Sequence, residues 1–166
     1  GTVRRIFAQA GDVVKEGDIA FVVHGSARSI LTTERLVLNC MQRMSGIATY
    51  THEMVEILAD TKTKILDTRK TSPIFRMCEK WAVAIGGGPL TFRCNPYTPN
   101  KYLNEKGKSL KIEVETRNIA EVEEALATKA VDIIMLDNMS LEQMREAVAL
   151  INGRVKVEAS GGITKE

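Results

Sequence analysis

The chain has 166 residues, 44% of them apolar and 27% charged, with a formal net charge of +2. This is the balance of an ordinary globular protein with room for one domain, or for one domain and part of another. The small net charge argues against a nucleic-acid surface, and the lack of a long apolar run argues against a membrane span, so we expect neither partner.

The first 30 residues predict a small β region. Gly11-Asp12 and Gly17-Asp18 are turn signals, and short β-type runs lie between and after them as far as Val23. Such closely spaced turns are typical of an antiparallel arrangement. The same turns are also similar to those of lipoyl- and biotinyl-type domains, which leaves a carrier or binding module as one alternative. No Met-Lys-Met hairpin follows them, however, and most of the chain has a different pattern.

A long helical segment is predicted between Ser29 and Ala59. Its apolar residues recur at helical spacing, and the residues 32–34 (Thr-Thr-Glu) are a suitable helix start. This start would place Arg35 at the head of the helix, where the helix dipole disfavours a cation unless an anion faces it. The change from a β pattern to a helical pattern predicts a boundary between residues 28 and 33.

The stretch 67–71 (Asp-Thr-Arg-Lys-Thr) is the most informative part of the chain. It follows the apolar run 64–66, which predicts a strand that ends in a loop. Arg69 and Lys70 are adjacent cations, and they repel one another unless an anion lies against them. Arg matches a carboxylate or phosphate bidentately, while Lys supplies a movable point charge. A solvated turn with two surface cations is the alternative for this pair alone, but polar residues also follow three later runs.

Those later runs predict a parallel sheet. Strands are predicted at 111–115, 131–137 and 155–162, and helices at 119–128 and 141–151. Asn118 and Ser140 are candidate N-caps for the two helices. Strands about 20 residues apart, with a helix between them, favour parallel pairing with right-handed crossovers. Polar residues collect at the strand ends where α/β folds build their sites: Glu115, Asp137, Glu158 and Ser160.

The three cysteines give a weaker indication. Cys40, Cys78 and Cys94 form no Cys-x-x-Cys pair, and two of them lie at apolar helix positions. This pattern predicts buried thiols rather than disulfides or metal ligands. Reduced thiols are typical of the cytoplasm, where we expect the protein to act.

Several motifs resemble the quinolinate phosphoribosyltransferase family, also called nicotinate-nucleotide pyrophosphorylase (carboxylating). They occur in the family's order at 31–39, 45–49, 67–73, 79–88, 113–115, 136–138 and 158–163. The resemblance covers about 1–88 and 101–166, and this many motifs in one order argue against chance similarity. It implies an α/β fold, an incomplete parallel β/α barrel preceded by part of a small α/β N-terminal domain. Residues 1–30 would be the remnant of an N-terminal α/β sandwich domain, and 31–166 the partial barrel domain.

The activity that the resemblance implies is a decarboxylating transfer. The pyridine nitrogen of quinolinate displaces pyrophosphate from 5-phosphoribosyl-1-pyrophosphate, and the 2-carboxylate leaves as CO2. The product is nicotinate mononucleotide, used in NAD synthesis. In the family, the arginine that matches Arg35 reaches into the neighbouring subunit's site. The resemblance therefore implies a homodimer, alone or within a larger oligomer, with shared active sites.

The implied site residues suit two anionic substrates. Glu115 and Asp137 would lie near the ribose hydroxyls and hold the implied cofactor, Mg²⁺, directly or indirectly. The turn 160–162 would offer backbone amides to the 5-phosphate. The catalytic assignments are Lys70, Glu115 and Asp137. The substrate-binding assignments are Arg35, Thr68, Arg69, Lys70, Glu115, Asp137, Ser160, Gly161 and Gly162.

The chain departs from the family pattern after Gly88. The family continues through an Asn-His-Arg motif and a Lys-Asp-Asn-His motif that line the pyridine site, and neither is present here. Arg93 is out of register with the expected arginine, and the prolines within the atypical stretch 89–100 exclude a central strand. We therefore expect one βα unit to be missing or replaced before Lys101, in a sequence that is part of a longer enzyme. A catalytically inactive structural relative is the second alternative.

Overall fold

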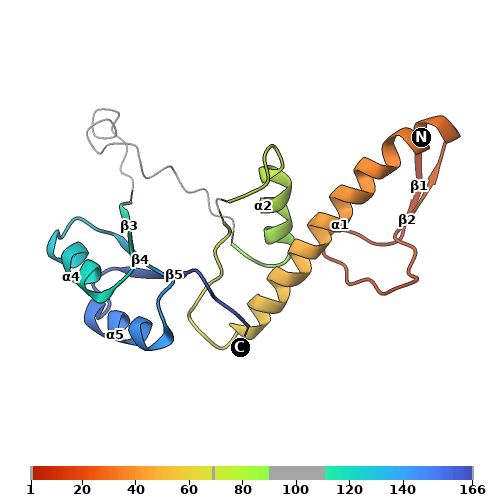
Figure 1. Cartoon of the computed structure of the whole chain (residues 1–166). Helices are drawn as coiled ribbons and strands as arrows, with labels where there is room; N and C mark the ends of the chain where they lie inside the picture. The colour runs from red at the N-terminus through yellow and green to blue at the C-terminus, as the bar shows by residue number, and fades with distance from the viewer. Residues whose placement is uncertain (1, 69, 90–110, 166) are drawn as a thin grey trace. The chain divides into compact units, whose positions relative to one another are not determined.

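The computed structural model describes residues 2–68, 70–89 and 111–165 (Figure 1). The chain divides into two compact units, Gly1–Arg93 and Cys94–Glu166. Each unit has its own packing and its own share of the predicted site residues. Among the described residues, no helix combines the length and the apolar character that crossing a membrane requires.

The first unit begins with an antiparallel pair of strands. β1 (Thr2–Ile6) pairs with β2 (Phe21–His24). Gly11 and Gly17 lie in the connection and have φ angles of 99° and 92°, which glycine adopts without strain. The antiparallel β region predicted from the turn signals is confirmed.

Helix α1 (Ala27–Ile57) begins earlier than predicted. Its N-cap residue is Ser26, whose hydroxyl accepts the backbone N–H of Ser29 at 3.2 Å. The predicted start at 32–34 is therefore wrong, because the first turns of α1 lie ahead of the apolar stripe on which that prediction depended. α1 passes through residues 30 and 31 without a break. A domain boundary there has no counterpart in the secondary structure, and the division into 1–30 and 31–166 stays a prediction.

Helix α2 (Arg76–Ile85) packs closely against α1. Gly86 follows α2 directly, and a Cβ atom at this position would lie 2.7 Å from the Cβ of Thr51, a buried residue of α1. A side chain at Gly86 would therefore force the two helices apart. Cys40 of α1 and Cys78 of α2 are free thiols and half-buried, so they are less buried than predicted. Cys94 lies outside the described residues.

The predicted strand at 64–66 is absent. Residues 63–68 have no regular secondary structure. A run with only two apolar residues, Ile65 and Leu66, is too short to hold an extended conformation without a neighbouring strand to pair with. The end of this run is held instead by a side chain, because the Asp67 carboxylate forms an ion pair with Lys80 of α2.

The second unit contains a three-stranded parallel sheet. Its strands are β3 (Glu113–Thr116), β4 (Ile133–Asp137) and β5 (Lys156–Ser160), adjacent in that order. α4 (Ile119–Ala127) and α5 (Leu141–Ile151) connect them. The three strands, the two helices and the parallel pairing are as predicted.

Both helices of this unit begin at the predicted caps. The Asn118 side chain accepts the N–H of Glu121 at 2.9 Å. Ser140 and Gln143 form a reciprocal capping box at the start of α5. These contacts satisfy backbone N–H groups that a helix start otherwise leaves without partners.

The core of the second unit lies between one face of the sheet and the two helices. Its largest fully buried side chains include Ile134 and Leu136 of β4, Val122 of α4 and Ile151 of α5. Side chains alternate along a strand, so the odd-numbered residues of β4 face away from this core. These elements establish an α/β fold with a parallel sheet, and the incomplete barrel stays a prediction.

Candidate functional site

Three predicted site residues share one face of the parallel sheet. In the register, Glu115 lies opposite Met135, and Asp137 lies opposite Ser160. Register partners in a parallel sheet project from the same face, so Glu115, Asp137 and Ser160 all face away from the helices. Glu115 is exposed, and the other two are half-buried. The structure therefore brings these three residues together, as the sequence predicted.

This face is rich in carboxylates. Glu113 precedes Glu115 by two residues on β3, and Glu158 lies opposite Met135 on β5. Within the described parts of the chain, no three His, Cys, Asp or Glu side chains form a group that could hold a metal ion by themselves. Glu115 and Asp137, the two predicted metal ligands, are therefore not part of such a group of described residues.

Arg117 adds a cation beside these acids, and sequence reasoning missed it. Its backbone N–H and its Nη2 donate to the two carboxylate oxygens of Glu121, at 2.8 and 3.0 Å. The hydrogen bond and charge of Glu121 raise the pKa of Arg117, and the negative charges of Glu115 and Asp137 raise it further. Its position one residue after β3 was the available signal, because polar residues at the ends of parallel strands are typical of sites in α/β folds.

The turn after β5 is closely fitted to the end of β4. Gly161 and Gly162 have φ angles of 80° and 65°, a conformation that favours glycine. The Asn138 backbone N–H donates to the Ser160 carbonyl at 2.8 Å, and its Nδ2 donates to the Asp137 carboxylate at 3.1 Å. Asn138 thus links a predicted catalytic acid to the predicted phosphate-binding turn, a role that its own sequence signal did not reveal.

The segment 67–72, which contains the predicted substrate-binding cations, belongs to the first unit, whereas Glu115 and Asp137 belong to the second. Thr68 and Lys70 are both exposed, and the Lys70 backbone N–H donates to the Thr68 hydroxyl at 3.0 Å. The Lys70 ammonium has no ion-pair partner among the residues that the structure describes. Arg69, predicted to bind substrate, lies outside those residues.

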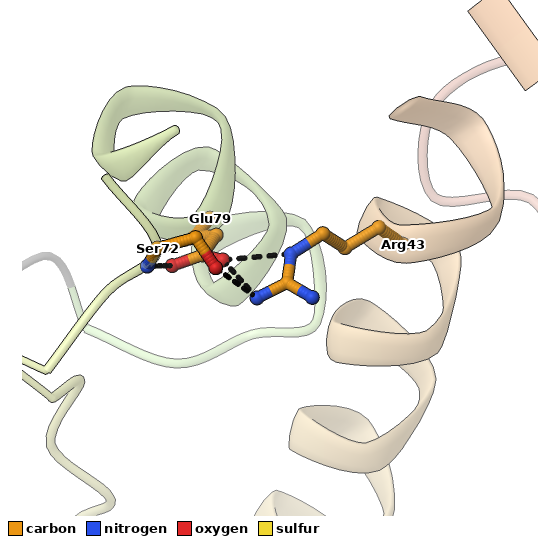
Figure 2. Close-up of polar contacts among 3 residues, drawn as sticks. All are labelled: Arg43, Ser72 and Glu79. Carbon is orange, nitrogen blue, oxygen red and sulfur yellow. Dashed lines mark hydrogen bonds and ion pairs between the residues drawn. The ribbon is translucent and has the colours of Figure 1, made fainter. Parts of the chain in front are cut away.

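Glu79 of α2 binds Ser72 at the C-terminal end of the segment 67–72 (Figure 2). Its Oε2 accepts the Ser72 backbone N–H at 3.1 Å, and its Oε1 accepts Nε of Arg43 at 2.7 Å. Nη2 of Arg43 also donates to the Ser72 hydroxyl at 2.7 Å. Burial raises the pKa of the Glu79 carboxyl, but the hydrogen bonds from Arg43 and Ser72 outweigh it and leave the pKa below its usual value. Glu79 is therefore a carboxylate that accepts hydrogen bonds from both Arg43 and Ser72.

Lys80, the next residue of α2, binds Asp67 at the N-terminal end of the segment 67–72. Its ammonium forms an ion pair with the Asp67 carboxylate, and the two side chains are only 5% and 3% exposed. Neither this pair nor that of Arg43 with Glu79 was foreseen, because the partners are 13 and 36 residues apart in sequence.

Arg35 is exposed on α1, as a residue that reaches another molecule must be. Its predicted place at the head of the helix is wrong, because α1 begins at Ala27, about two turns earlier. The helix dipole therefore gives no separate reason to expect an anion near this side chain.

Comparison with protein families matches the chain over nearly its whole length. The model described as quinolinate phosphoribosyl transferase, N-terminal domain, matches residues 2–45. The corresponding C-terminal domain model matches residues 47–103 and 98–166. The two parts of the C-terminal match overlap at residues 98–103, at the end of the atypical stretch 89–100.

Two relatives and one solved structure illustrate the similarity of the chain to known proteins. A probable nicotinate-nucleotide pyrophosphorylase (carboxylating) of Bacillus subtilis is 39% identical over 94% of this chain and 60% of its own length. A mitochondrial quinolinate phosphoribosyltransferase (decarboxylating) of Nicotiana tabacum is 40% identical over 96% of the chain and 55% of its own. The crystal structure of NadC from Streptococcus pyogenes matches with a TM-score of 0.77 and 39% identity, over 99% of this chain and 64% of that one. The chain thus spans somewhat over half the length of these relatives.

Proposed function

The chain belongs to the quinolinate phosphoribosyltransferase family, and we propose that it carries out that family's decarboxylating phosphoribosyl transfer. Quinolinate and 5-phosphoribosyl-1-pyrophosphate would be the substrates. Nicotinate mononucleotide, pyrophosphate and CO2 would be the products, in NAD biosynthesis. The observation that carries the proposal is the shared sheet face of Glu115, Asp137 and Ser160, in a chain matched by both family domains.

The chemistry follows from two polyanionic substrates. The lone pair of the pyridine nitrogen forms a bond to C1 of the ribose while the bond from C1 to pyrophosphate breaks. The electron pair of the broken bond leaves with pyrophosphate. The ribose gains positive character as this bond lengthens, so carboxylates near its hydroxyls lower the barrier. Glu115 and Asp137 suit this role because both are at the strand ends of one face. The ring then loses CO2 from C2, and the electron pair left there takes up a proton.

The carboxylates of quinolinate need cations. Lys70 offers an exposed ammonium between the anchored residues Asp67 and Ser72, and Thr68 offers a hydroxyl beside it. Arg69 stays part of this proposal on the strength of the motif alone. A positive charge near the carboxylates orients the ring nitrogen toward the ribose, and such orientation is a large part of the rate of a two-substrate reaction.

Magnesium fits the two-carboxylate arrangement. The ion is commonly held by one or two carboxylates together with waters and substrate phosphates, and Glu115 with Asp137 supply the protein part of such a set. When bound, the ion would offset the charge that accumulates on the departing pyrophosphate. The successive positive φ angles at Gly161 and Gly162 support the assignment of this turn to the 5-phosphate.

The proposal extends to the barrel fold, the assembly of subunits and the cellular compartment. We expect the parallel sheet to belong to an incomplete β/α barrel, and the protein to form a homodimer in which exposed Arg35 serves the partner's site. The cytoplasm remains the expected compartment, although the tobacco relative is named as mitochondrial. The N-terminal family model covers the turns at Gly11 and Gly17, so the carrier-module alternative has no support.

Turnover tests the proposal directly. The full chain should form nicotinate mononucleotide and CO2 from the two substrates in the presence of Mg²⁺. Lys70→Ala should raise the KM for quinolinate about tenfold to a hundredfold, because a charged contact contributes about 1.5 to 3 kcal/mol. Lys64→Ala is the matched control, since Lys64 is also an exposed lysine of this segment. A wild-type protein that folds but makes no nicotinate mononucleotide would establish the inactive relative instead.

A further inference from the structure

We infer that Glu79 and Lys80 act together as a clamp that positions the segment 67–72 for substrate binding. The inference rests on the proposed function, because it concerns how Lys70 and Thr68 are presented to an anionic substrate. Glu79 and Lys80 would be positioning residues. They bind the ends of the segment and leave the cation between them exposed.

The geometry of the clamp comes from two neighbouring helix positions. Successive residues of an α-helix project about 100° apart, so adjacent side chains reach two separate points. Lys80 reaches the Asp67 carboxylate, and Glu79 accepts the Ser72 backbone N–H at 3.1 Å. Arg43 of α1 binds both Glu79 and Ser72, which fixes the second anchor to a second helix (Figure 2).

Between these anchors, the described residues have no regular secondary structure. At residues 68, 70 and 71, no ladder or helical hydrogen bonds define the path of the chain. The contact of the Lys70 N–H with the Thr68 hydroxyl shapes the turn locally, but it does not attach the turn to the rest of the unit. The position of Lys70 relative to α2 therefore depends on the side chains that hold Asp67 and Ser72.

Stability alone is a poor explanation for the buried pair. The Lys80 and Asp67 side chains are 5% and 3% exposed, so both charges have lost nearly all their contact with water. Replacing such a pair by apolar residues is often neutral or stabilising, whereas the pair fixes one geometry. Precision is what a substrate-binding cation needs, since a displacement of about 1 Å can reduce activity about a hundredfold.

The experiment separates positioning from stability with three variants of the full chain. Lys80→Met removes the ammonium that forms an ion pair with the buried Asp67 carboxylate. The double variant Asp67→Asn, Lys80→Met removes both charges and should regain most of the lost Tm. Thr51→Ala is the control, because Thr51 is buried beside Gly86 and Gly88, and no hydrogen bond or ion pair of the segment's described residues involves it.

Amide hydrogen exchange gives a readout that needs no turnover. In the double variant, we expect the backbone amides of residues 68–72 to exchange about tenfold faster than in the wild type, although Tm has recovered. Thr51→Ala should lower Tm without this local change. A double variant with native exchange rates in 68–72 would overturn the clamp, whether or not the wild type is an active enzyme.

Kinetics then connects the clamp to the reaction. The double variant should raise the KM for quinolinate on the order of 10- to 100-fold and leave the KM for 5-phosphoribosyl-1-pyrophosphate near the wild-type value. Lys80→Arg keeps the charge and should retain a KM much closer to the wild type. Fast exchange with a native KM for quinolinate would show that the clamp orders the segment without serving the substrate. Failure of the proposed function is a separate result, because it appears as absent turnover in the wild type.

Discussion

The Asn138 side chain occupies the space that a Cβ atom on Gly161 would need. Asn138 follows β4 directly, and Gly161 follows β5 directly, so their contact fits the ends of two neighbouring strands to each other. The same Asn138 side chain donates to the Asp137 carboxylate at 3.1 Å. A change at Gly161 is therefore transmitted to a predicted catalytic acid.

Gly161→Ala should impair both the turn and the use of 5-phosphoribosyl-1-pyrophosphate. The substitution adds a clash with Asn138 to the strain of a left-handed backbone, where φ is 80°. Gly153→Ala is the matched control: φ is 70°, and nothing lies within 4 Å of the added Cβ. The control should lose only about 1 to 2 kcal/mol of unfolding free energy, from the left-handed conformation. Gly161→Ala should lose more and raise the KM for the phosphoribosyl donor, as measured by denaturation and steady-state kinetics.

Adding Asn138→Gly to Gly161→Ala should restore part of the lost stability, since it removes the atoms that clash and glycine adopts the φ of 52° at this position without strain. Equal stability of Gly161→Ala and Gly153→Ala would show that the Asn138 contact relaxes freely.

Glu79 should make the protein less stable in acid. Its folded-state pKa lies below the ordinary glutamate value of about 4.3, because Arg43 and Ser72 donate to the carboxylate and outweigh the effect of burial. A lowered pKa means that the ionised form stabilises the fold. This contribution is complete above the unfolded-state pKa and is lost as pH falls through the folded-state pKa. Glu79→Gln should therefore reduce the dependence of Tm on pH below about pH 4.3. The same acid dependence in both proteins would assign it to other carboxylates.

Asp137→Asn should reduce the magnesium-dependent rate while quinolinate binding stays nearly intact. Asn is nearly isosteric with Asp, and its carbonyl still accepts from Asn138, so the main loss is the negative charge. Glu113→Gln is a control on the same sheet face, two residues before Glu115, and it should have a smaller effect. Rates over a magnesium titration and calorimetric binding of quinolinate measure the two properties. Equal loss of both would mean that Asp137 organises the whole pocket.

Arg35 and Lys70 should complement one another between subunits. If Arg35 acts in the partner's site, a mixed dimer of Arg35→Ala and Lys70→Ala has one site with both native residues. Random mixing of equal amounts makes about half the dimers mixed, so about a quarter of all sites should work. The exposed position of Arg35 on α1 permits this arrangement. Activity that stays at the level of the separate variants, after subunit exchange has been demonstrated by labelled chains, would place Arg35 in its own chain's site.

The parts of the fold that sequence predicted best are those governed by local patterns. The apolar run of β4 and the cap at Ser140 each contain their own signal within a few residues. The run at 64–66 had no such support, because a strand depends on a partner that may lie anywhere in the chain. The start of α1 was missed for a related reason: Ser26 caps turns that carry no apolar stripe.

The same distinction holds for the site. The shared sheet face of Glu115, Asp137 and Ser160 could be predicted because parallel strands bring their ends together, so position along each strand was sufficient. The ion pairs of Arg43 with Glu79 and of Asp67 with Lys80 depend on how α2 packs within the first unit. The local sequence around each of these four residues did not indicate its partner, which only the tertiary structure shows.

The order of the strands has a consequence for folding. Because β3, β4 and β5 are adjacent in chain order, each strand pairs with the next one along the chain. Only the two crossover connections, each containing one helix, have to close before these pairs form. The entropy lost on closure grows slowly with the length of the connection. Contacts that are close in sequence also favour rapid folding. We therefore expect the pairing of β3 with β4 and of β4 with β5, which builds the acidic sheet face, to depend on contacts between neighbouring parts of the chain and not on the meeting of distant segments.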